Sequence, residues 1–231
     1  MPHSKENKIE DFAFDYLNNY YASQQGAKNI FVGRSELNKY GVEVEGIFAF
    51  KQPDSALFLS TVTFNNSQKI GALLTNYKKV GMSKIRFLTP LVFLLLGLFI
   101  SITINNNIYV WAFFSLSALG GFILHTYLAK AYLKLQLESM IEEMKQYKAN
   151  EQWLGLSVSS LVFRNNSLAN YFLKLCQSRG IGLITVGKRA KVSLLQEPRI
   201  RISHHGDFIS HYASEDIIRK AIQIDSMLRV A

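Results

Sequence analysis

The sequence predicts an α/β (α+β) domain with a mixed sheet and flanking helices, interrupted by a hairpin of two transmembrane helices. The hairpin is predicted by two apolar runs, 87–104 and 108–128, and by the absence of Lys, Arg, Asp and Glu from Phe87 through Ala129. The domain is predicted by helix-like and strand-like patterns on both sides of these runs. We divide the chain into residues 1–86, 87–128 and 129–231.

The two apolar runs have the length of membrane-spanning helices. Each approaches the roughly 20 residues that a helix needs to cross a hydrocarbon core of about 30 Å. Only three asparagines, residues 105–107, separate them, which suits a tight turn and is too short for a soluble domain. The alternative is a pair of core helices in a soluble protein. Such helices usually carry charge on one face, so the uncharged pattern favours the membrane.

Basic residues flank the hairpin on both outer sides, whereas the asparagine turn carries no charge. Positively charged flanks stay in the cytoplasm, so we expect an inner-membrane protein with two spans and both termini cytoplasmic. No ionisable group lies at mid-membrane, which indicates an anchor and not a transport pathway. The flanking cations would contact anionic lipid headgroups. They are Lys78, Lys79, Lys84, Arg86, Lys130 and Lys134.

Composition narrows the kinds of function and site that the sequence allows. The net charge of +9 could serve nucleic acid, although the basic flanks of the hairpin account for much of it. The single cysteine, Cys176, excludes an internal disulfide and a cysteine zinc site. Residues 1–30 are polar and mixed in charge, so we expect no cleavable signal peptide and assign insertion to the first span.

The N-terminal block predicts a helix, three strands and a second helix. Apolar residues recur at helical spacing in 5–24, and strand formers gather in three later stretches. A turn at 52–55 would join the last two strands into a hairpin. The predicted strands are 29–33, 42–50 and 57–64, and the second helix is 67–79.

The C-terminal block begins with an amphipathic helix, 130–148, that continues the second span. This helix is either a coiled-coil stalk or a helix laid against the domain, and it offers a surface to a protein partner. The following segments are a strand or irregular stretch at 151–160, helices at 168–178 and 214–228, and strands at 181–186 and 191–195. Neither block is complete alone, so we expect them to fold together across the hairpin.

Two motifs suggest chemistry without supplying a complete site. Residues 182–188 match the spacing of a phosphate-binding loop, but Arg189 stands where Ser or Thr should hold magnesium. The only histidine cluster could supply metal ligands, although adjacent histidines on a strand point to opposite faces, and the alternative is a polar loop. No nucleophile elbow supports a Ser/His/Asp hydrolase, and we expect no cofactor. The cluster is His204, His205, Asp207 and His211.

Acidic residues on the first helix and on the second strand form the third signal. Glu10 lies on the helix, and Glu43 and Glu45 lie on the strand. With the order helix, three strands, helix and strand, this stretch resembles the PD-(D/E)XK, or restriction-endonuclease-like, superfamily, in particular a group of bacterial membrane-associated proteins with that fold. The resemblance implies a two-metal site that activates water for phosphodiester hydrolysis. Glu10, Glu43 and Glu45 would be its ligands, with Lys69 as the lysine.

The sequence departs from that family at the catalytic motif. Glu45-Gly46 falls where Asp-Gly belongs, but the next strand carries STVTF over 60–64 where Glu and Lys are expected. The simplest interpretation of Glu43 and Glu45 is a solvated strand face. We therefore predict a membrane-anchored binding or scaffold module with an inactive nuclease-like fold. The alternatives are a membrane-tethered metal-dependent nuclease and a small subunit of a membrane complex.

Overall fold

The computed structural model describes residues 3–52, 56–82, 84–103, 108–187, 190–199 and 207–227. It divides into two compact units. The sheet unit comprises Met1–Thr75 and Ser139–Ala231, and the hairpin unit comprises Asn76–Glu138. The expected turn at 52–55 falls partly, and the asparagine turn at 105–107 wholly, outside the described residues.

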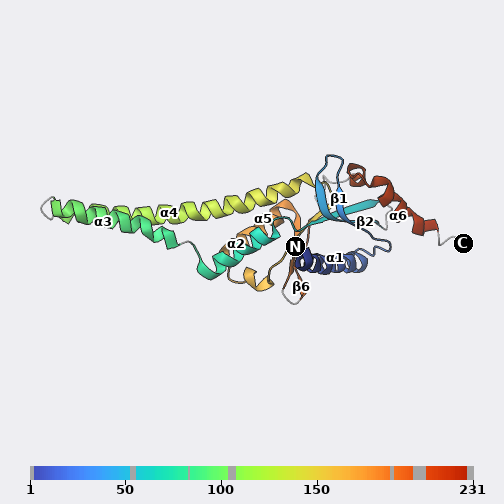
Figure 1. Cartoon of the computed structure of the whole chain (residues 1–231), viewed down its shortest axis with the longest axis horizontal. Helices are drawn as coiled ribbons and strands as arrows, with labels where there is room; N and C mark the ends of the chain where they lie inside the picture. The colour runs from blue at the N-terminus through green and yellow to red at the C-terminus, as the bar shows by residue number, and fades with distance from the viewer. Residues whose placement is uncertain are drawn as a thin grey trace. The chain divides into compact units, whose positions relative to one another are not determined.

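A six-stranded mixed sheet forms the centre of the sheet unit (Figure 1). The strands lie in the order β1-β2-β3-β4-β5-β6; β3, β4 and β5 run parallel, and the other neighbours are antiparallel. As the sequence predicts, β3 pairs with β2 and shares the sheet with β5. The strands are β1 (Phe31–Leu37), β2 (Glu43–Lys51), β3 (Leu57–Thr63), β4 (Glu151–Leu156), β5 (Ile181–Val186) and β6 (Val192–Gln196).

Four helices accompany the sheet, at the positions that the helical spacing predicts. They are α1 (His3–Gln24), α2 (Ser67–Val80), α5 (Ser167–Arg179) and α6 (Glu215–Met227). Short 3-10 helices are Lys84–Phe87, Glu143–Gln146, Ser160–Phe163 and Phe208–His211. Asn166 caps the start of helix α5, and its side chain accepts hydrogen bonds from the N–H groups of Leu168 and Ala169. Gly180 caps the end of the helix and adopts φ 76°.

Helix α1 covers one face of the sheet. Its Phe14, Leu17 and Tyr21 are buried in one cluster with Phe48 and Phe50 of β2. Phe48 and Phe50 share a face because side chains alternate along a strand. At the same strand, a Cβ on Gly46 would lie 2.3 Å from the Phe14 ring, so only glycine lets this ring reach the sheet.

Helix α6 packs on a second core cluster of the sheet. Its Ile218 and Ile222 are buried with Ile47 and Ala49, which alternate with Phe48 and Phe50 along β2. Strand β2 is therefore buried on both faces. This explains its nearly continuous apolar sequence, which departs from strict alternation.

The hairpin unit contains α3 (Leu88–Thr103) and α4 (Ile108–Glu142) as far as residue 138, and the two apolar helices lie side by side in Figure 1. Close packing occurs at Gly97, where a Cβ would lie 2.6 Å from Phe114. The hydroxyl of Thr89 lies 3.3 Å from Nδ1 of His125. The helices are antiparallel, because residues early in α3 meet residues late in the apolar part of α4.

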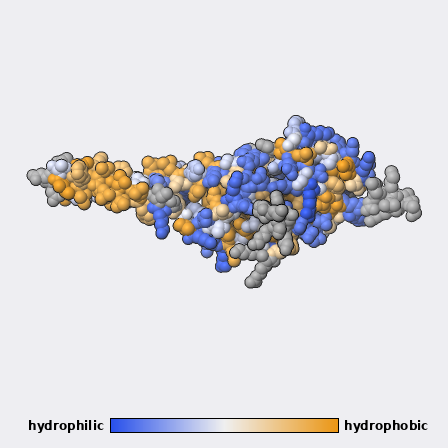
Figure 2. Space-filling view, viewed as in Figure 1, coloured by the Kyte–Doolittle hydropathy of each residue, from blue (hydrophilic) through white to orange (hydrophobic). Residues whose placement is uncertain are grey.

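Of the described helices, α4 alone is long and apolar enough to cross a membrane, while α3 is shorter at 16 residues. Most of the apolar side chains of both are exposed, including Phe99 (70%), Ile102 (74%) and Leu116 (71%). On the face seen in Figure 2, apolar side chains cover much of the two helices. Helix α4 also continues the second predicted span without a break, as expected, although the α-helix ends at Glu142 and not at residue 148.

Candidate functional site

A cleft of about 320 Å³ opens in the sheet unit between the start of α1, the end of β3 and the start of α2. Carboxylates, amides, hydroxyls and one ammonium group line it, with a single aromatic ring. The lining residues are Glu10, Glu45, Phe64, Asn65, Asn66, Ser67, Gln68, Lys69 and Ser157. Such a lining suits a polar ligand held by hydrogen bonds.

The cleft lies at the carboxyl ends of two neighbouring parallel strands. Phe64 follows β3 and Ser157 follows β4, and the backbone N–H of Ser157 donates a hydrogen bond of 2.8 Å to the Ser67 hydroxyl at the start of α2. In open α/β sheets, ligands bind in the crevice beyond the carboxyl ends of the strands. The position of the cleft therefore agrees with a ligand site in this class of fold.

Glu45 occupies the cleft wall as a turn-capping residue. Its Oε2 accepts hydrogen bonds from the Thr63 hydroxyl at 2.9 Å, from the Asn65 N–H at 3.0 Å and from the Phe64 N–H. These groups belong to the turn between β3 and α2. A carboxylate that satisfies three donors stabilises this turn, and the same oxygen has little remaining capacity for a metal ion.

The cross-strand neighbour of Glu45 is a threonine. Gly46 pairs with Val62, so Glu45 meets Thr63, whose hydroxyl donates to it. Threonine supplies one neutral hydroxyl and no negative charge at this position. The described residues contain no group of three His, Cys, Asp or Glu side chains that could hold a metal ion.

The structure brings together three of the four acidic and basic candidates that the sequence singles out. Glu10, Glu45 and Lys69 all line the cleft. Glu43 does not: it is exposed at the first position of β2, opposite Leu37. The two-metal arrangement would need Glu43 to converge with the other two carboxylates, and the described geometry lacks this convergence.

Sequence reasoning missed the residues of the C-terminal block that lie near Glu45 and its turn. Burial first, and then the nearby Glu45 carboxylate, raise the pKa of Tyr147, whereas the neighbouring Asn65 and Thr63 side chains act to lower it. Asn66, at φ 61°, donates a 2.6 Å hydrogen bond to Glu143. Only the asparagine pair before the predicted helix at 67–79 gave a local signal, because Asn tolerates the left-handed conformation. The contacts to 143 and 147 are long-range and have no signature in the sequence.

The histidine cluster is only partly within the described residues. His204 and His205 lie outside them, as do Lys188 and Arg189 of the loop-like motif. His211 ends a 3-10 helix, and its backbone oxygen accepts from the N–H of Lys39. The fourth candidate, Asp207, forms an ion pair with Arg219, so its carboxylate is engaged by the protein.

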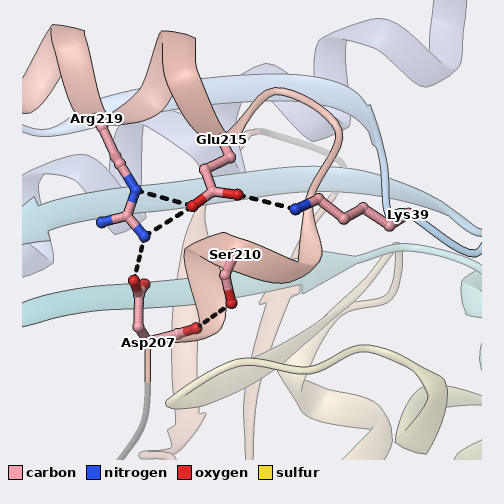
Figure 3. A network of polar contacts seen from close by, with 5 residues as sticks. All are labelled: Lys39, Asp207, Ser210, Glu215 and Arg219. Atoms are coloured by element: carbon pink, nitrogen blue, oxygen red, sulfur yellow. Dashed lines mark hydrogen bonds and ion pairs between the residues drawn. The ribbon is translucent and has the colours of Figure 1, made fainter.

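Asp207 belongs to a chain of ion pairs on the surface of α6 (Figure 3). Arg219 contacts Asp207 and, at 2.9 Å, Glu215, whose other oxygen accepts from Lys39 at 2.9 Å. Hydrogen bonds from Lys39 first, and then from Arg219, lower the pKa of Glu215. These contacts hold α6 to the turn after β1, and they explain the polar residues here without a ligand.

The sheet unit also contains a buried carboxylate that does not line the cleft. Glu151, at the start of β4, is 6% exposed, and its Oε2 accepts a 2.8 Å hydrogen bond from the Tyr21 hydroxyl. Tyr21 also contacts the Ser60 hydroxyl at 2.6 Å and accepts from the Trp153 indole at 2.7 Å. Burial raises the pKa of Glu151 to about 7, and the Glu197 carboxylate contributes in the same direction.

Comparisons of the chain with protein-family models, with curated proteins and with solved structures gave no match.

Proposed function

We propose that this protein is a membrane-anchored binding or scaffold module with a nuclease-like fold that does not hydrolyse phosphodiesters. The α3–α4 hairpin would be the anchor and the cleft beside Glu45 the ligand site. The observation that carries the proposal is the Glu45 carboxylate, which is hydrogen-bonded to three groups of its own turn. An enzyme of the two-metal type needs that carboxylate for its metal ions.

The nuclease-like fold is supported by the order of elements. Helix α1, strands β1 to β3, helix α2 and strand β4 follow one another as in the core to which the sequence is similar, and β3 and β4 are parallel neighbours. Glu10 and Glu45 reach one cleft from α1 and β2. The missing carboxylate and lysine of β3 are the reason that we assign binding and not hydrolysis.

Two membrane crossings are supported by the sheet itself. Residues 57–63 and 151–156 form hydrogen-bonded neighbouring strands, so the chain must be on the same side of the membrane before and after the hairpin. It then crosses an even number of times. If α4 spans, the stretch containing α3 must span too, since the turn between them is only a few residues long.

Solvation supports membrane insertion of the hairpin unit. Leaving side chains such as Phe99, Ile102 and Leu116 in water, rather than in an apolar medium, costs about 1.5–3 kcal/mol each. Contiguous apolar surface of this kind marks an interaction site or a membrane. The basic residues at one end of the unit support a cytoplasmic location for the sheet unit.

The charge of the cleft argues against nucleic acid as its ligand. Two carboxylates, Glu10 and Glu45, face one ammonium group, Lys69. A phosphate backbone requires a basic surface, because cations displace its condensed counterions. We therefore propose a polar ligand that is neutral or cationic where it contacts the cleft.

Cleavage assays test the absence of hydrolysis. The full chain, purified in detergent, should leave supercoiled DNA and single-stranded RNA intact with Mg²⁺ or Mn²⁺. The matched variant is Glu45→Gln, which keeps the size of the side chain and removes its charge. Metal-dependent cleavage by the parent chain that disappears in Glu45→Gln would establish the nuclease alternative. Anchoring is tested separately by alkaline carbonate extraction, which should leave the chain in the membrane pellet.

A further inference from the structure

One face of α4 stays apolar and exposed beyond the predicted span. Leu124 and Leu128 are 59% and 56% exposed, and Tyr132 and Leu135 are 68% and 62% exposed. Steps of four, four and three residues place these side chains on one face of the helix. The face becomes polar at Ser139, which is also exposed. The exposed apolar face of the hairpin unit therefore extends two turns past residue 128.

The opposite face of the same turns has a different character. Leu137 is fully buried, and Lys130 lies on this side, half a turn away from Leu128 and Tyr132. The face with Leu128, Tyr132 and Leu135 is thus continuous with the proposed lipid-facing surface of α4, and it is not part of a core.

Helix length fixes where this face meets the bilayer. From Ile108 to Leu128 the helix extends about 31 Å, which equals a hydrocarbon core of roughly 30 Å. From Ile108 to Leu135 it extends about 42 Å. A helix along the membrane normal would leave Tyr132 and Leu135 beyond the core. A tilt of about 30°, within the range of membrane helices, keeps both in the headgroup zone.

Basic residues lie at the same end of the hairpin unit as the apolar face, with Lys130 on the opposite side of α4. Lys84 and Lys130 are exposed. The Arg86 guanidinium lies 4.9 Å from the centre of the Phe87 ring and 5.7 Å from that of Phe122. Long cationic side chains reach headgroup phosphates while their stems remain on apolar surface. Tyr132 has the amphipathic ring that is enriched at this depth.

We propose that the face of α4 formed by Leu124, Leu128, Tyr132 and Leu135 is a docking surface for the headgroup zone of anionic phospholipids, with α4 tilted to bring it there. The proposal rests on membrane insertion of the hairpin, as given under the proposed function. It extends membrane contact beyond the span and makes that contact sensitive to lipid charge.

Spin labels on single introduced cysteines test the depth of this face. The variants are Tyr132→Cys and Leu135→Cys, with Leu116→Cys as the control inside the span, in vesicles of phosphatidylcholine with and without phosphatidylglycerol. Cys176 does not interfere because it is buried, and burial raises the pKa of its thiol to about 12. The labelled parent chain gives the background.

Labels at 132 and 135 should collide with dissolved oxygen more than with a water-soluble nickel chelate, at a shallower depth than the label at 116. Phosphatidylglycerol should reduce nickel access further, and Lys84→Gln with Lys130→Gln should abolish that change.

Nickel access at 132 and 135, with 116 still in lipid, would overturn this proposal alone. Spin–spin broadening at 132 would overturn it in favour of a second copy of the chain. Nickel access at 116 would instead contradict membrane insertion.

Discussion

The sheet unit and the hairpin unit use the same apolar residue types in opposite ways. Phe48 and Phe50 of β2 are fully buried, whereas Phe99 of α3 is 70% exposed and Ile108 of α4 is 75% exposed. The sheet unit removes its aromatic rings from water by covering both faces of β2. The hairpin unit leaves aromatic rings such as that of Phe99 on its surface. The difference fits our proposal that the hairpin unit lies in a membrane.

Alanine substitution of one phenylalanine in each unit should give the largest contrast. Phe48→Ala removes a ring from a closed core, and we expect the sheet unit to lose about 3–5 kcal/mol of unfolding free energy. Phe99→Ala removes a ring that lies outside the protein, so the same free energy should change little. Denaturant titration of the full chain in detergent, in a Trp111→Phe background so that fluorescence reports on buried Trp153, measures both. Equal losses would contradict the contrast between the units.

The buried carboxylate should make the stability of the sheet unit depend on pH. The pKa of Glu151 is about 7 in the folded protein and near 4.5 otherwise, so folding binds a proton between these values. The contribution of Glu151 to stability is then fully present below pH 4.5 and is lost as the pH rises through 7, by about 3 kcal/mol in all. Glu151→Gln should remove this decrease and be the more stable protein at pH 8.

Glu197→Gln is the matched control for that prediction. Glu197 is exposed, and its charge only assists the rise in the pKa of Glu151. The variant should retain the pH dependence with a slightly lower midpoint. An unchanged slope in Glu151→Gln would show that another group carries the titration.

The turn that Glu45 caps at the cleft should contribute less to the free energy of unfolding than Phe48 or the buried Glu151. Glu45→Ala leaves the Thr63 hydroxyl and the N–H groups of Phe64 and Asn65 without their acceptor, at a cost of about 2 kcal/mol. Thr63→Val removes one donor and should cost about 1 kcal/mol. Thermal unfolding measures both. If Glu45→Ala stabilised the chain, Glu45 would be a strained functional carboxylate and not a cap.

The ion pairs in Figure 3 should contribute least to the stability of the folded protein. Lys39→Ala removes one of the two cations that lower the pKa of Glu215. Lys39 and Glu215 are both accessible to solvent, so salt screens their attraction. We expect a small decrease in Tm at low ionic strength that disappears at high salt. A decrease that persisted in salt would indicate a packing role for the Lys39 side chain.

Local sequence patterns predicted the helices and strands, whereas the structure of the cleft depends on long-range contacts that these patterns do not contain. Helical spacing identified α1 and α5, and strand formers identified β2, β3 and β5 within a few residues. Glu10, Glu45 and Lys69 were also singled out, because acidic helix and strand positions are visible in the sequence. Their neighbours Tyr147 and Ser157 were missed, since the chain between β3 and β4 runs through the whole hairpin. No pattern in the sequence identifies the partner that a side chain meets about 90 residues later, as Ser67 meets Ser157.

The most direct test of the central claim is the accessibility of the hairpin tip. Tyr109→Cys and Asn76→Cys place a reactive thiol near the turn of the hairpin and before its first helix, at exposed positions. A membrane-impermeant maleimide should label residue 109 only in right-side-out vesicles and residue 76 only in inside-out vesicles. Labelling of both residues from the same side would contradict the account, because the hairpin would then enter the bilayer without crossing it.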